Sequence, residues 1–281
     1  MFLVTGGGGQ LGSALQRVLA ARGVSCAAPA HAELDVCDDE AVARAFARHA
    51  PRVVVNCAAL TKVDTCEREP QLAERANALA PAQLARACAA HGAKLVQLST
   101  DYVFAGDASR PYREDDPPAP RSVYGRTKLA GERAALASPD ALVVRTSWVY
   151  GRGRNFPAAI LAQAREGKPL RVVADQRGRP TYASDLAEAI VRLVAVNARG
   201  IVNFANDGEA SWLELARAVL DASGFADRAI EPLTTAQLAL PAPRPAYSIL
   251  DLERVKSLGV APRSWQEALA AYLTSPDAPS D

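Results

Sequence analysis

The chain has 281 residues, of which 49% are hydrophobic and 22% charged, and its formal net charge is +1. This length accommodates one large α/β domain or two smaller ones, and the composition is that of a water-soluble globular protein. The near-zero net charge, with arginines spread along the chain, argues against a nucleic-acid or a membrane partner. The start of the chain has no signal-peptide pattern and no apolar run reaches about 18 residues, so we expect a cytoplasmic protein.

In the first half of the chain, short apolar runs alternate with segments of helical periodicity. This rhythm predicts helices between successive strands, and continuous apolar strands are typical of a parallel sheet covered on both faces. We expect strands at 2–4, 24–28, 53–55, 94–98 and 142–144, and helices at 10–22, 38–49, 73–91 and 123–136.

After residue 145 the alternation loosens. We expect a helix at 156–166, a strand at 170–173, a helix at 184–196 and a strand at 201–204. The proline-bearing segments 105–121 and 231–247 are too long for simple connections, so we interpret them as functional loops or lids. The last residues, 276–281, are expected to be frayed.

These patterns predict an α/β fold, namely a Rossmann-type doubly wound parallel sheet with a smaller, mixed α/β C-terminal substrate-binding domain. We expect the dinucleotide-binding domain to comprise residues 1–147 with 170–204. The substrate-binding domain, interleaved with it, is expected to comprise 148–169 with 205–281.

A glycine-rich turn follows the first predicted strand, with Gly6, Gly9 and Gly12 spaced as G-x-x-G-x-x-G. At the start of a helix, such a turn lets backbone N–H groups and the helix dipole approach a pyrophosphate. Glycines also occur in turns for backbone reasons alone. The position between the first strand and the first helix favours the phosphate interpretation over that alternative.

The second strand ends without the carboxylate that would hold the adenosine ribose 2′-hydroxyl, since 27–31 reads Ala-Ala-Pro-Ala-His. Nothing there repels a 2′-phosphate, so NADP(H) should be tolerated. His31 either approaches that phosphate or lies in an exposed loop without a role. Asp35 and Val36 follow and could border the adenine.

A candidate catalytic set begins with Thr100 at the end of the fourth strand and continues with Tyr124 and Lys128. The i, i+4 spacing of the last two places both side chains on one face of a helix. A hydroxyl at a strand end can polarise a carbonyl, and a tyrosine can donate its proton to the oxygen. A nearby ammonium should lower the tyrosine pKa from about 10 toward the working range. A Tyr–Lys pair alone is common by chance; with the strand-end Ser-Thr and the glycine turn it is specific.

The chain thereby resembles the extended short-chain dehydrogenase/reductase superfamily and, within it, the dTDP-4-dehydrorhamnose reductase family. The resemblance covers nearly the whole chain. The most specific motifs are Ser-Thr-Asp-Tyr-Val-Phe at 99–104, Arg-Thr-Ser-Trp-Val-Tyr at 145–150 and Asp-Gln-Arg-Gly-Arg-Pro-Thr at 175–181.

The resemblance implies that NADPH or NADH reduces the C4 keto group of a dTDP-linked 4-keto-6-deoxy sugar, with Tyr124 as the general acid and Thr100 beside it. Lys128 would also bond the nicotinamide ribose. The implied cofactor contacts are Gly6, Gly9, Gln10, Leu11, Gly12, Asp35, Val36, Ala58, Ala59, Thr61, Tyr124 and Lys128. The implied substrate contacts are Val63, Asp101, Tyr102 and Trp148, with Asn155 and Arg244 as further candidates for the pyrophosphate.

The expectations for metal binding and for assembly both follow from one residue that differs from the pattern of similar proteins. Many similar proteins carry a glutamate two residues after the third glycine, and in some it joins a magnesium-bridged dimer; here the residue is Ala14. We therefore expect no metal site of that type, and a monomer or a weak homodimer. The five cysteines form no C-x-x-C, so we expect buried, reduced thiols and no disulfide or metal.

Two alternatives stay open. The first is another sugar-nucleotide epimerase or reductase on the same scaffold, against which the motifs at 145–150 and 175–181 argue. The second is a non-catalytic binding subunit, since proteins similar to this family serve as regulatory partners of methionine adenosyltransferase. The intact set of Thr100, Tyr124 and Lys128 argues against that reading.

Overall fold

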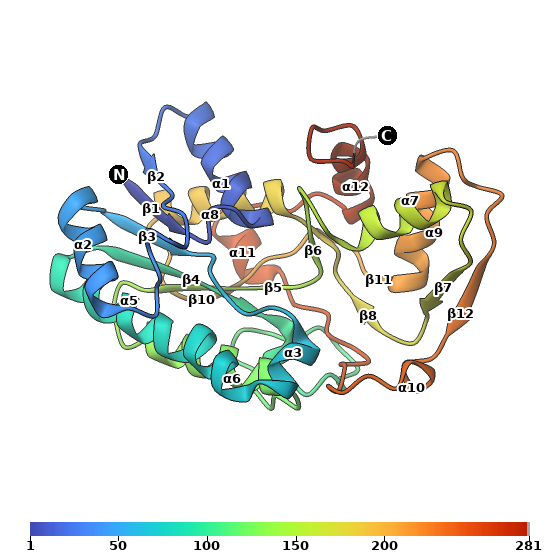
Figure 1. The fold of residues 1–281 in the computed structure, drawn as a ribbon, viewed down its shortest axis with the longest axis horizontal. Helices are drawn as coiled ribbons and strands as arrows, with labels where there is room; N and C mark the ends of the chain where they lie inside the picture. The colour runs from blue at the N-terminus through green and yellow to red at the C-terminus, as the bar shows by residue number, and fades with distance from the viewer. Residues whose placement is uncertain (280–281) are drawn as a thin grey trace.

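A six-stranded parallel sheet forms the centre of the protein in the computed structural model, which describes residues 1–279. Across the sheet the strands run in the order β10-β5-β4-β3-β1-β2 (Figure 1). Because the chain moves to one side from β1 to β2 and to the other from β3 onward, the order reverses between β1 and β3. The strands are β1 (Phe2–Thr5), β2 (Cys26–Ala27), β3 (Val53–Asn56), β4 (Lys94–Thr100), β5 (Leu142–Thr146) and β10 (Gly200–Asn203).

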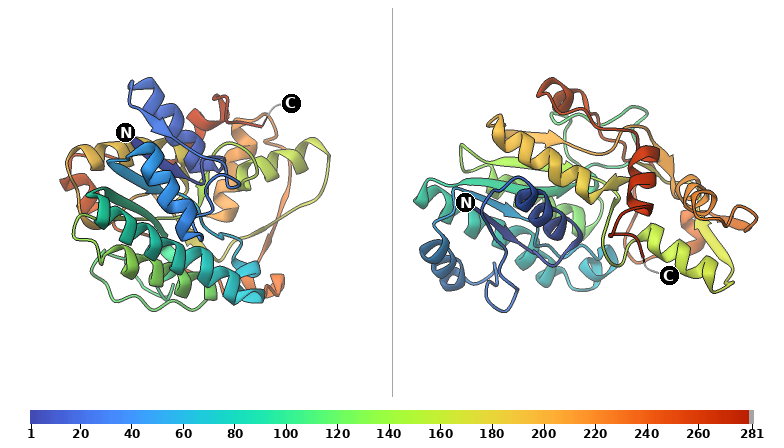
Figure 2. Two further views of the ribbon diagram at one scale, coloured as in Figure 1. Left: turned by 60° about the vertical axis from the view of Figure 1, so that its left-hand side comes forward. Right: turned by 90° about the horizontal axis from the view of Figure 1, so that it is seen from above.

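Helices cover both faces of this sheet, as Figures 1 and 2 show. α1 (Gln10–Ala21) and α8 (Ala183–Ala195) pack on the face to which Val4 and Val55 point. α2 (Asp39–His49), α5 (Ala80–His91) and α6 (Val123–Ala135) pack on the other, against Leu3 and Val54. Successive strand residues therefore enter opposite cores, which is why the strands read as unbroken apolar runs. The predicted fold class is confirmed.

The expected helix 73–91 is longer and is interrupted. The helical segment comprises α4 (Pro70–Glu74), a π-helical turn η1 (Arg75–Leu79) and α5. Pro81 has no N–H and cannot donate to the carbonyl of Asn77, four residues earlier, and this disrupts the regular ladder. The Asn77 carbonyl lies against Gly131 of α6, where a β-carbon would come within 2.2 Å of it.

A second core lies beside the sheet, toward the right in Figure 1. It is built on α7 (Phe156–Arg165), α9 (Trp212–Ala222) and α12 (Trp265–Leu273). Three two-stranded sheets accompany these helices. They pair β6 (Val149–Tyr150) with β9 (Thr181–Tyr182), β7 (Leu170–Val173) with β12 (Ile230–Leu233), and β8 (Arg177–Gly178) with β11 (Ala210–Ser211). Shorter elements are α3 (Val63–Arg68), the 3-10 turn η2 (Asp101–Val103), α10 (Thr235–Leu238) and α11 (Glu253–Ser257).

Two segments lie elsewhere than the sequence suggested. β7 was expected with the nucleotide-binding part, but it pairs with β12, and Leu170 packs in the second core. Conversely, Leu252 and Val255, around α11, pack in the core of the central sheet. The physical reason is that an apolar run of four residues does not reveal which sheet it joins. The division into two domains itself stays a prediction.

The C-terminal segment is anchored where it was expected to fray. Asp277 is 6% exposed, pairs with Arg17 at 2.6 Å and accepts a hydrogen bond from the Tyr182 hydroxyl at 3.1 Å. The expectation of a frayed tail is therefore wrong for Asp277, and residues 280–281 lie outside the described part. All five cysteines are free thiols, two of them buried and three partly buried. Among residues 1–279, no helix combines the length and apolar character needed to span a membrane.

Candidate active site

A cavity of about 580 Å³ opens at the carboxyl ends of β1, β3 and β4, where the strand order reverses. This is the position at which open α/β sheets bind ligands. The predicted residues that line it are Gly6, Gly9, Gln10, Leu11, Gly12, Ala59, Thr61, Val63, Thr100, Asp101, Tyr102, Tyr124, Lys128 and Trp148. Lining residues that the sequence analysis did not single out are Cys57, Leu98, Ser99, Thr146, Ser147, Val149, Leu186 and Trp212.

The glycine turn is a tight backbone cradle. Gly6 has a φ of 63°, and a β-carbon on Gly12 would come within 2.3 Å of the Gly6 carbonyl oxygen. Only glycine fits both places without strain. Gly9 is the residue before α1, and no side chain caps the helix there. The first N–H groups of α1 thus have no side-chain acceptor, and together with the helix dipole they are suited to a phosphate. The turn fits a dinucleotide.

The Thr100, Tyr124 and Lys128 side chains meet in the cavity. α6 begins directly before Tyr124 because the Ser122 hydroxyl accepts a hydrogen bond from the Gly125 N–H at 3.1 Å. Tyr124 is 9% exposed, and the Thr100 side chain lies close enough to its phenol to counteract the rise in the phenol pKa. α6 lies close to the end of β4, since a β-carbon on Gly125 would approach the Tyr102 carbonyl oxygen within 2.2 Å.

Thr100 has two further partners. Its hydroxyl donates to Asp101 Oδ1 at 2.9 Å and accepts from the Tyr102 N–H at 3.2 Å. Burial raises the pKa of Asp101 to about 6, against hydrogen bonds from Ser248 and Thr100 that lower it. The Thr100 hydroxyl is therefore held at the cavity by its acceptor Asp101.

Lys128 lines the cavity beside Tyr124 as expected, and one of its three donors is already used. Its Nζ donates a 2.6 Å hydrogen bond to the Leu98 carbonyl oxygen, and burial lowers its pKa to about 8. Burial raises the pKa of Tyr124, the Thr100 side chain opposes the rise, and the nearby Asp101 adds to it. Lys128 is not among the groups that shift the pKa of Tyr124 here, so the expected lowering of that pKa by the ammonium is not seen in this structure, where desolvation dominates.

One wall of the cavity consists of two tryptophans from different segments. The rings of Trp148 and Trp212 stack with centroids 3.6 Å apart and planes inclined by 7°. Trp148 adopts a φ of 46°, and its ring packs directly on Gly178, where a β-carbon would approach Cε2 within 2.3 Å. The Trp212 indole donates to the Gln176 side chain at 3.0 Å. Nothing in the sequence pattern distinguishes Trp212 from a core aromatic.

Five predicted contacts lie outside this cavity, namely Asp35, Val36, Ala58, Asn155 and Arg244. Asp35 accepts from the Cys37 N–H and lies 3.5 Å from Arg75. The Asn155 side chain caps α7 and bonds the Tyr272 hydroxyl. Arg244 pairs with Asp64 of α3 at 2.8 Å, which ties the proline-rich segment 231–247 to the start of α3, where the preceding residue, Val63, lines the cavity.

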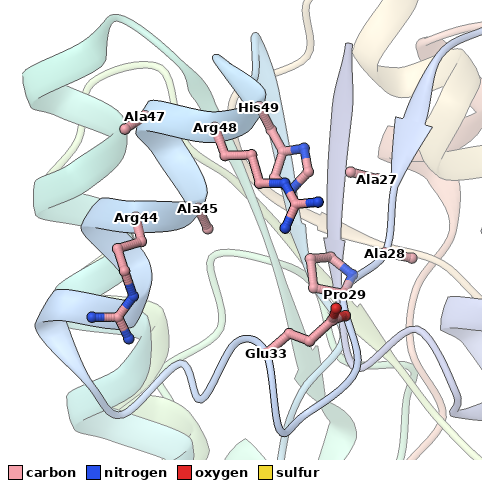
Figure 3. Close-up of a pocket in the computed structure, with 9 residues that line it drawn as sticks. All are labelled: Ala27, Ala28, Pro29, Glu33, Arg44, Ala45, Ala47, Arg48 and His49. Atoms are coloured by element: carbon pink, nitrogen blue, oxygen red, sulfur yellow. The ribbon is translucent and has the colours of Figure 1, made fainter.

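A second hollow, of about 760 Å³, lies between α2 and the segment that follows β2 (Figure 3). Arg44, Arg48 and His49 line it from α2, and Glu33 lines it from the segment after β2. Ala28 borders this hollow and also abuts the glycine turn, since a β-carbon on Gly7 would approach its Cβ within 2.8 Å. Basic side chains therefore outnumber carboxylates beside the end of β2.

The described residues 1–279 contain no group of three or more His, Cys, Asp and Glu side chains arranged to hold a metal. Ala14 is 1% exposed and packs in the core with α8. The nearby carboxylates have partners, since Glu188 pairs with Arg22 and Asp185 with Arg263.

Fold and site together define an NAD(P)-dependent oxidoreductase of the extended short-chain dehydrogenase/reductase type. Residues 1–277 match the profile of the RmlD substrate binding domain family, and the chain belongs to this family. The dTDP-4-dehydrorhamnose reductase of Streptomyces griseus is 46% identical over 277 residues, covering 95% of this chain and 91% of that protein.

Two further proteins are similar over nearly their whole length. A probable dTDP-4,6-dihydroxy-2-methyloxan-3-one 4-ketoreductase of Streptomyces antibioticus is 46% identical over 276 residues, covering 95% of this chain and 92% of that protein. The crystal structure of dTDP-4-dehydrorhamnose reductase from Bacillus anthracis in complex with NADP has a TM-score of 0.94 at 35% identity. It matches 97% of this chain and 98% of that chain.

Proposed function

We propose that the protein reduces the C4 keto group of dTDP-4-dehydro-L-rhamnose with NADPH or NADH, giving dTDP-L-rhamnose. The observation that carries this proposal is the meeting of Thr100, Tyr124 and Lys128 in one cavity beside the glycine turn. Relatives that bear this reductase name, and the related structure in complex with NADP, support it.

The proposed cofactor site uses the glycine cradle for the pyrophosphate. Gly6, Gly9 and Gly12 would admit the phosphates, with Gln10 and Leu11 at the start of α1. Ala58, Ala59 and Thr61 follow β3 on the other side of the reversal point. We also propose that Asp35 and Val36 border the adenine of the cofactor.

When bound, the nicotinamide supplies the hydride that reduces the sugar carbon. Tyr124 holds the carbonyl oxygen and donates its phenolic proton to it as negative charge develops. The Thr100 hydroxyl turns from Asp101 toward the same oxygen and polarises the carbonyl. Lys128 would bond the nicotinamide ribose and would support the proton supply to Tyr124 from one helical turn away.

The proposed sugar subsite lies between the end of β4 and the tryptophan wall. Val63, Asp101, Tyr102 and Trp148 would contact the deoxy sugar, and Trp212 backs Trp148. Arg244, held by Asp64 at the start of α3, is suited to the diphosphate by its planar fork of donors. The diphosphate role of Asn155 stays a prediction, since the structure gives its amide partners within the protein.

The domain division also enters as a proposal. We propose the expected boundaries with two changes: β7 joins the substrate-binding part and the segment around α11 joins the nucleotide-binding part. The assembly as a monomer or weak homodimer stays a prediction.

The sugar nucleotide named for the Streptomyces antibioticus 4-ketoreductase should be tested as a second substrate. That protein is as similar to this chain as the reductase of Streptomyces griseus is, since both are 46% identical to it. The epimerase and regulatory-subunit alternatives make a different prediction, namely no net oxidation of NADPH. The experiment generates dTDP-4-dehydrorhamnose in situ, follows the absorbance of NADPH and, separately, of NADH, and identifies the product by mass and NMR. Stoichiometric formation of dTDP-L-rhamnose supports the proposal; absence of oxidation of both NADPH and NADH contradicts it.

A further inference from the structure

A charged pair lies fully inside the protein, next to the helix that carries Tyr124 and Lys128. Glu132 of α6 is 1% exposed and Arg145 of β5 is 2% exposed. Arg145 Nε and Nη2 each donate a 2.8 Å hydrogen bond, one to each carboxylate oxygen of Glu132. Desolvation of two such charges often cancels their attraction, so a buried pair is weak evidence for stability. Its position suggests another role.

The guanidinium of Arg145 is fixed from further sides. Its Nη1 donates to the Glu114 carbonyl oxygen at 3.1 Å, and its Cζ lies 4.9 Å from the centre of the Phe104 ring. Its backbone belongs to β5, where its carbonyl accepts from the Phe204 N–H at 2.8 Å. Because the guanidinium is held in place, its two parallel hydrogen bonds also fix the position of the Glu132 carboxylate.

Lys128 lies one helical turn before Glu132 and is 4% exposed. The ionisable groups that act on it are Glu132 on its own helix, Cys57 from the segment after β3 and Cys66 of α3. Burial raises the pKa of both thiols, that of Cys57 to about 12, so both are neutral at pH 7. Of these groups Glu132 is therefore the one that carries charge, and it favours the ammonium form of Lys128 against desolvation.

We propose that Glu132 and Arg145 form a positioning pair for Lys128: the guanidinium fixes the buried carboxylate one helical turn from the Lys128 side chain. Neither residue lines the cavity, so both act through Lys128. The inference rests on the proposed function for the use that the reaction makes of Lys128. The effect of Glu132 on the pKa of Lys128 can be measured without any reaction.

The direct test is the titration of Lys128 by NMR in protein labelled with ¹³C at the lysine Cε. The chain contains only five lysines, so Lys128→Arg assigns the signal. In the wild-type protein we expect Lys128 to titrate near pH 8. In Glu132→Gln the midpoint should fall by about one pH unit or more, because an opposite charge is lost.

Glu132→Gln leaves Arg145 buried without its counter-ion and can unfold the chain. Glu132→Gln/Arg145→Met removes both charges together, and its Lys128 midpoint should also fall, because the carboxylate that favours the ammonium is absent from this variant as well. Asp185→Asn is the matched control, because Asp185 binds Arg263 through the same fork without acting on Lys128. An unmoved Lys128 midpoint in the folded variants overturns the proposal, and so does loss of folding in both.

A second arm separates this inference from the proposed function. With NADPH and dTDP-4-dehydrorhamnose as substrates, the alkaline fall in kcat should begin at a lower pH in the Glu132 variants than in the wild-type protein. A merely structural pair would instead lower kcat equally at all pH values. A wild-type protein without turnover would defeat the proposed function, and the NMR titration would still decide the pair. A wild-type protein with turnover and an unmoved alkaline fall in the variants would defeat the pair alone.

Discussion

Gly12 packs so closely on Gly6 that a β-carbon on Gly12 would lie 2.3 Å from the Gly6 carbonyl oxygen and 2.7 Å from the Gly7 α-carbon. These neighbours are backbone atoms, which cannot move aside as a flexible side chain could. The cradle in front of α1 therefore depends on the absence of a side chain at residue 12.

Gly12→Ala should weaken NADPH binding by about tenfold or more and lower the thermal midpoint, because the turn must open to admit the methyl group. Gly8→Ala is the matched control, since no atom lies within 4 Å of a β-carbon placed there. Titration calorimetry with NADPH and thermal unfolding measure both effects. Equal NADPH affinity in the two variants would contradict the role of the cradle.

NADPH should be accepted at least as well as NADH. β2 itself ends without a carboxylate, and Arg44 and Arg48 line the adjoining hollow together with a single carboxylate, Glu33, which accepts a hydrogen bond from the Ala30 N–H. Asp35, which lies outside that hollow, already bonds the Cys37 N–H and lies by Arg75. Comparing kcat/KM for the two cofactors decides the matter, and a strong preference for NADH would point to Asp35.

Activity and hydrodynamic size should survive excess EDTA. Hard divalent cations require several oxygen ligands, and the buried methyl of Ala14 supplies none. The alternative carboxylates Glu188 and Asp185 are paired with Arg22 and Arg263. Rate and sedimentation are followed before and after chelation. A loss that magnesium restores would reveal a site built from other residues.

Asp101→Asn should change the pH dependence of stability. In the folded protein the Asp101 pKa is raised to about 6 from 3.8. The folded state therefore binds the proton more tightly, and the stability contributed by Asp101 is lost as pH rises from about 4 to about 6. As pH rises over that range, the free energy of unfolding of the variant should increase relative to that of the wild-type protein by up to about 3 kcal/mol.

Asp116→Asn provides a control of opposite sign. The Arg110 hydrogen bond lowers the pKa of Asp116 to about 2, so its contribution is present above pH 4 and lost as pH falls toward 2. Its removal should destabilise the protein near neutral pH and have less effect in acid. Denaturant unfolding at pH 2, 4, 5.5 and 7 compares the three proteins. Parallel pH profiles for wild type and Asp101→Asn would refute the assigned burial effect.

Much of the central sheet could be predicted because its strands are buried on both faces, and the helix signals between them are strong. The limits of β7 were predicted well but its partner was not, since a short apolar run carries no information on pairing. The π-helical turn is explained by Pro81, which is visible in the sequence. The close approach of the Asn77 carbonyl to Gly131 of another helix is not visible there.

The candidate site could be predicted where a motif fixed a residue beside the cofactor cleft, as for Thr100, Tyr124 and Lys128. It could not be predicted where residues meet across distant segments. Trp212 reaches Trp148 from an element 64 positions later in the chain. Arg244 finds Asp64 over a still longer separation, and no local pattern signals that pair.

The most direct test of the account is the turnover number of Tyr124→Phe with NADPH and dTDP-4-dehydrorhamnose. Loss of a positioned proton donor should reduce kcat by about 10²-fold or more and leave NADPH affinity largely intact. Tyr150→Phe is the control, because the buried Tyr150 hydroxyl lies outside the cavity and has no hydrogen-bond partner among the described residues. Near wild-type turnover in folded Tyr124→Phe would contradict the assignment of Tyr124 as the proton donor.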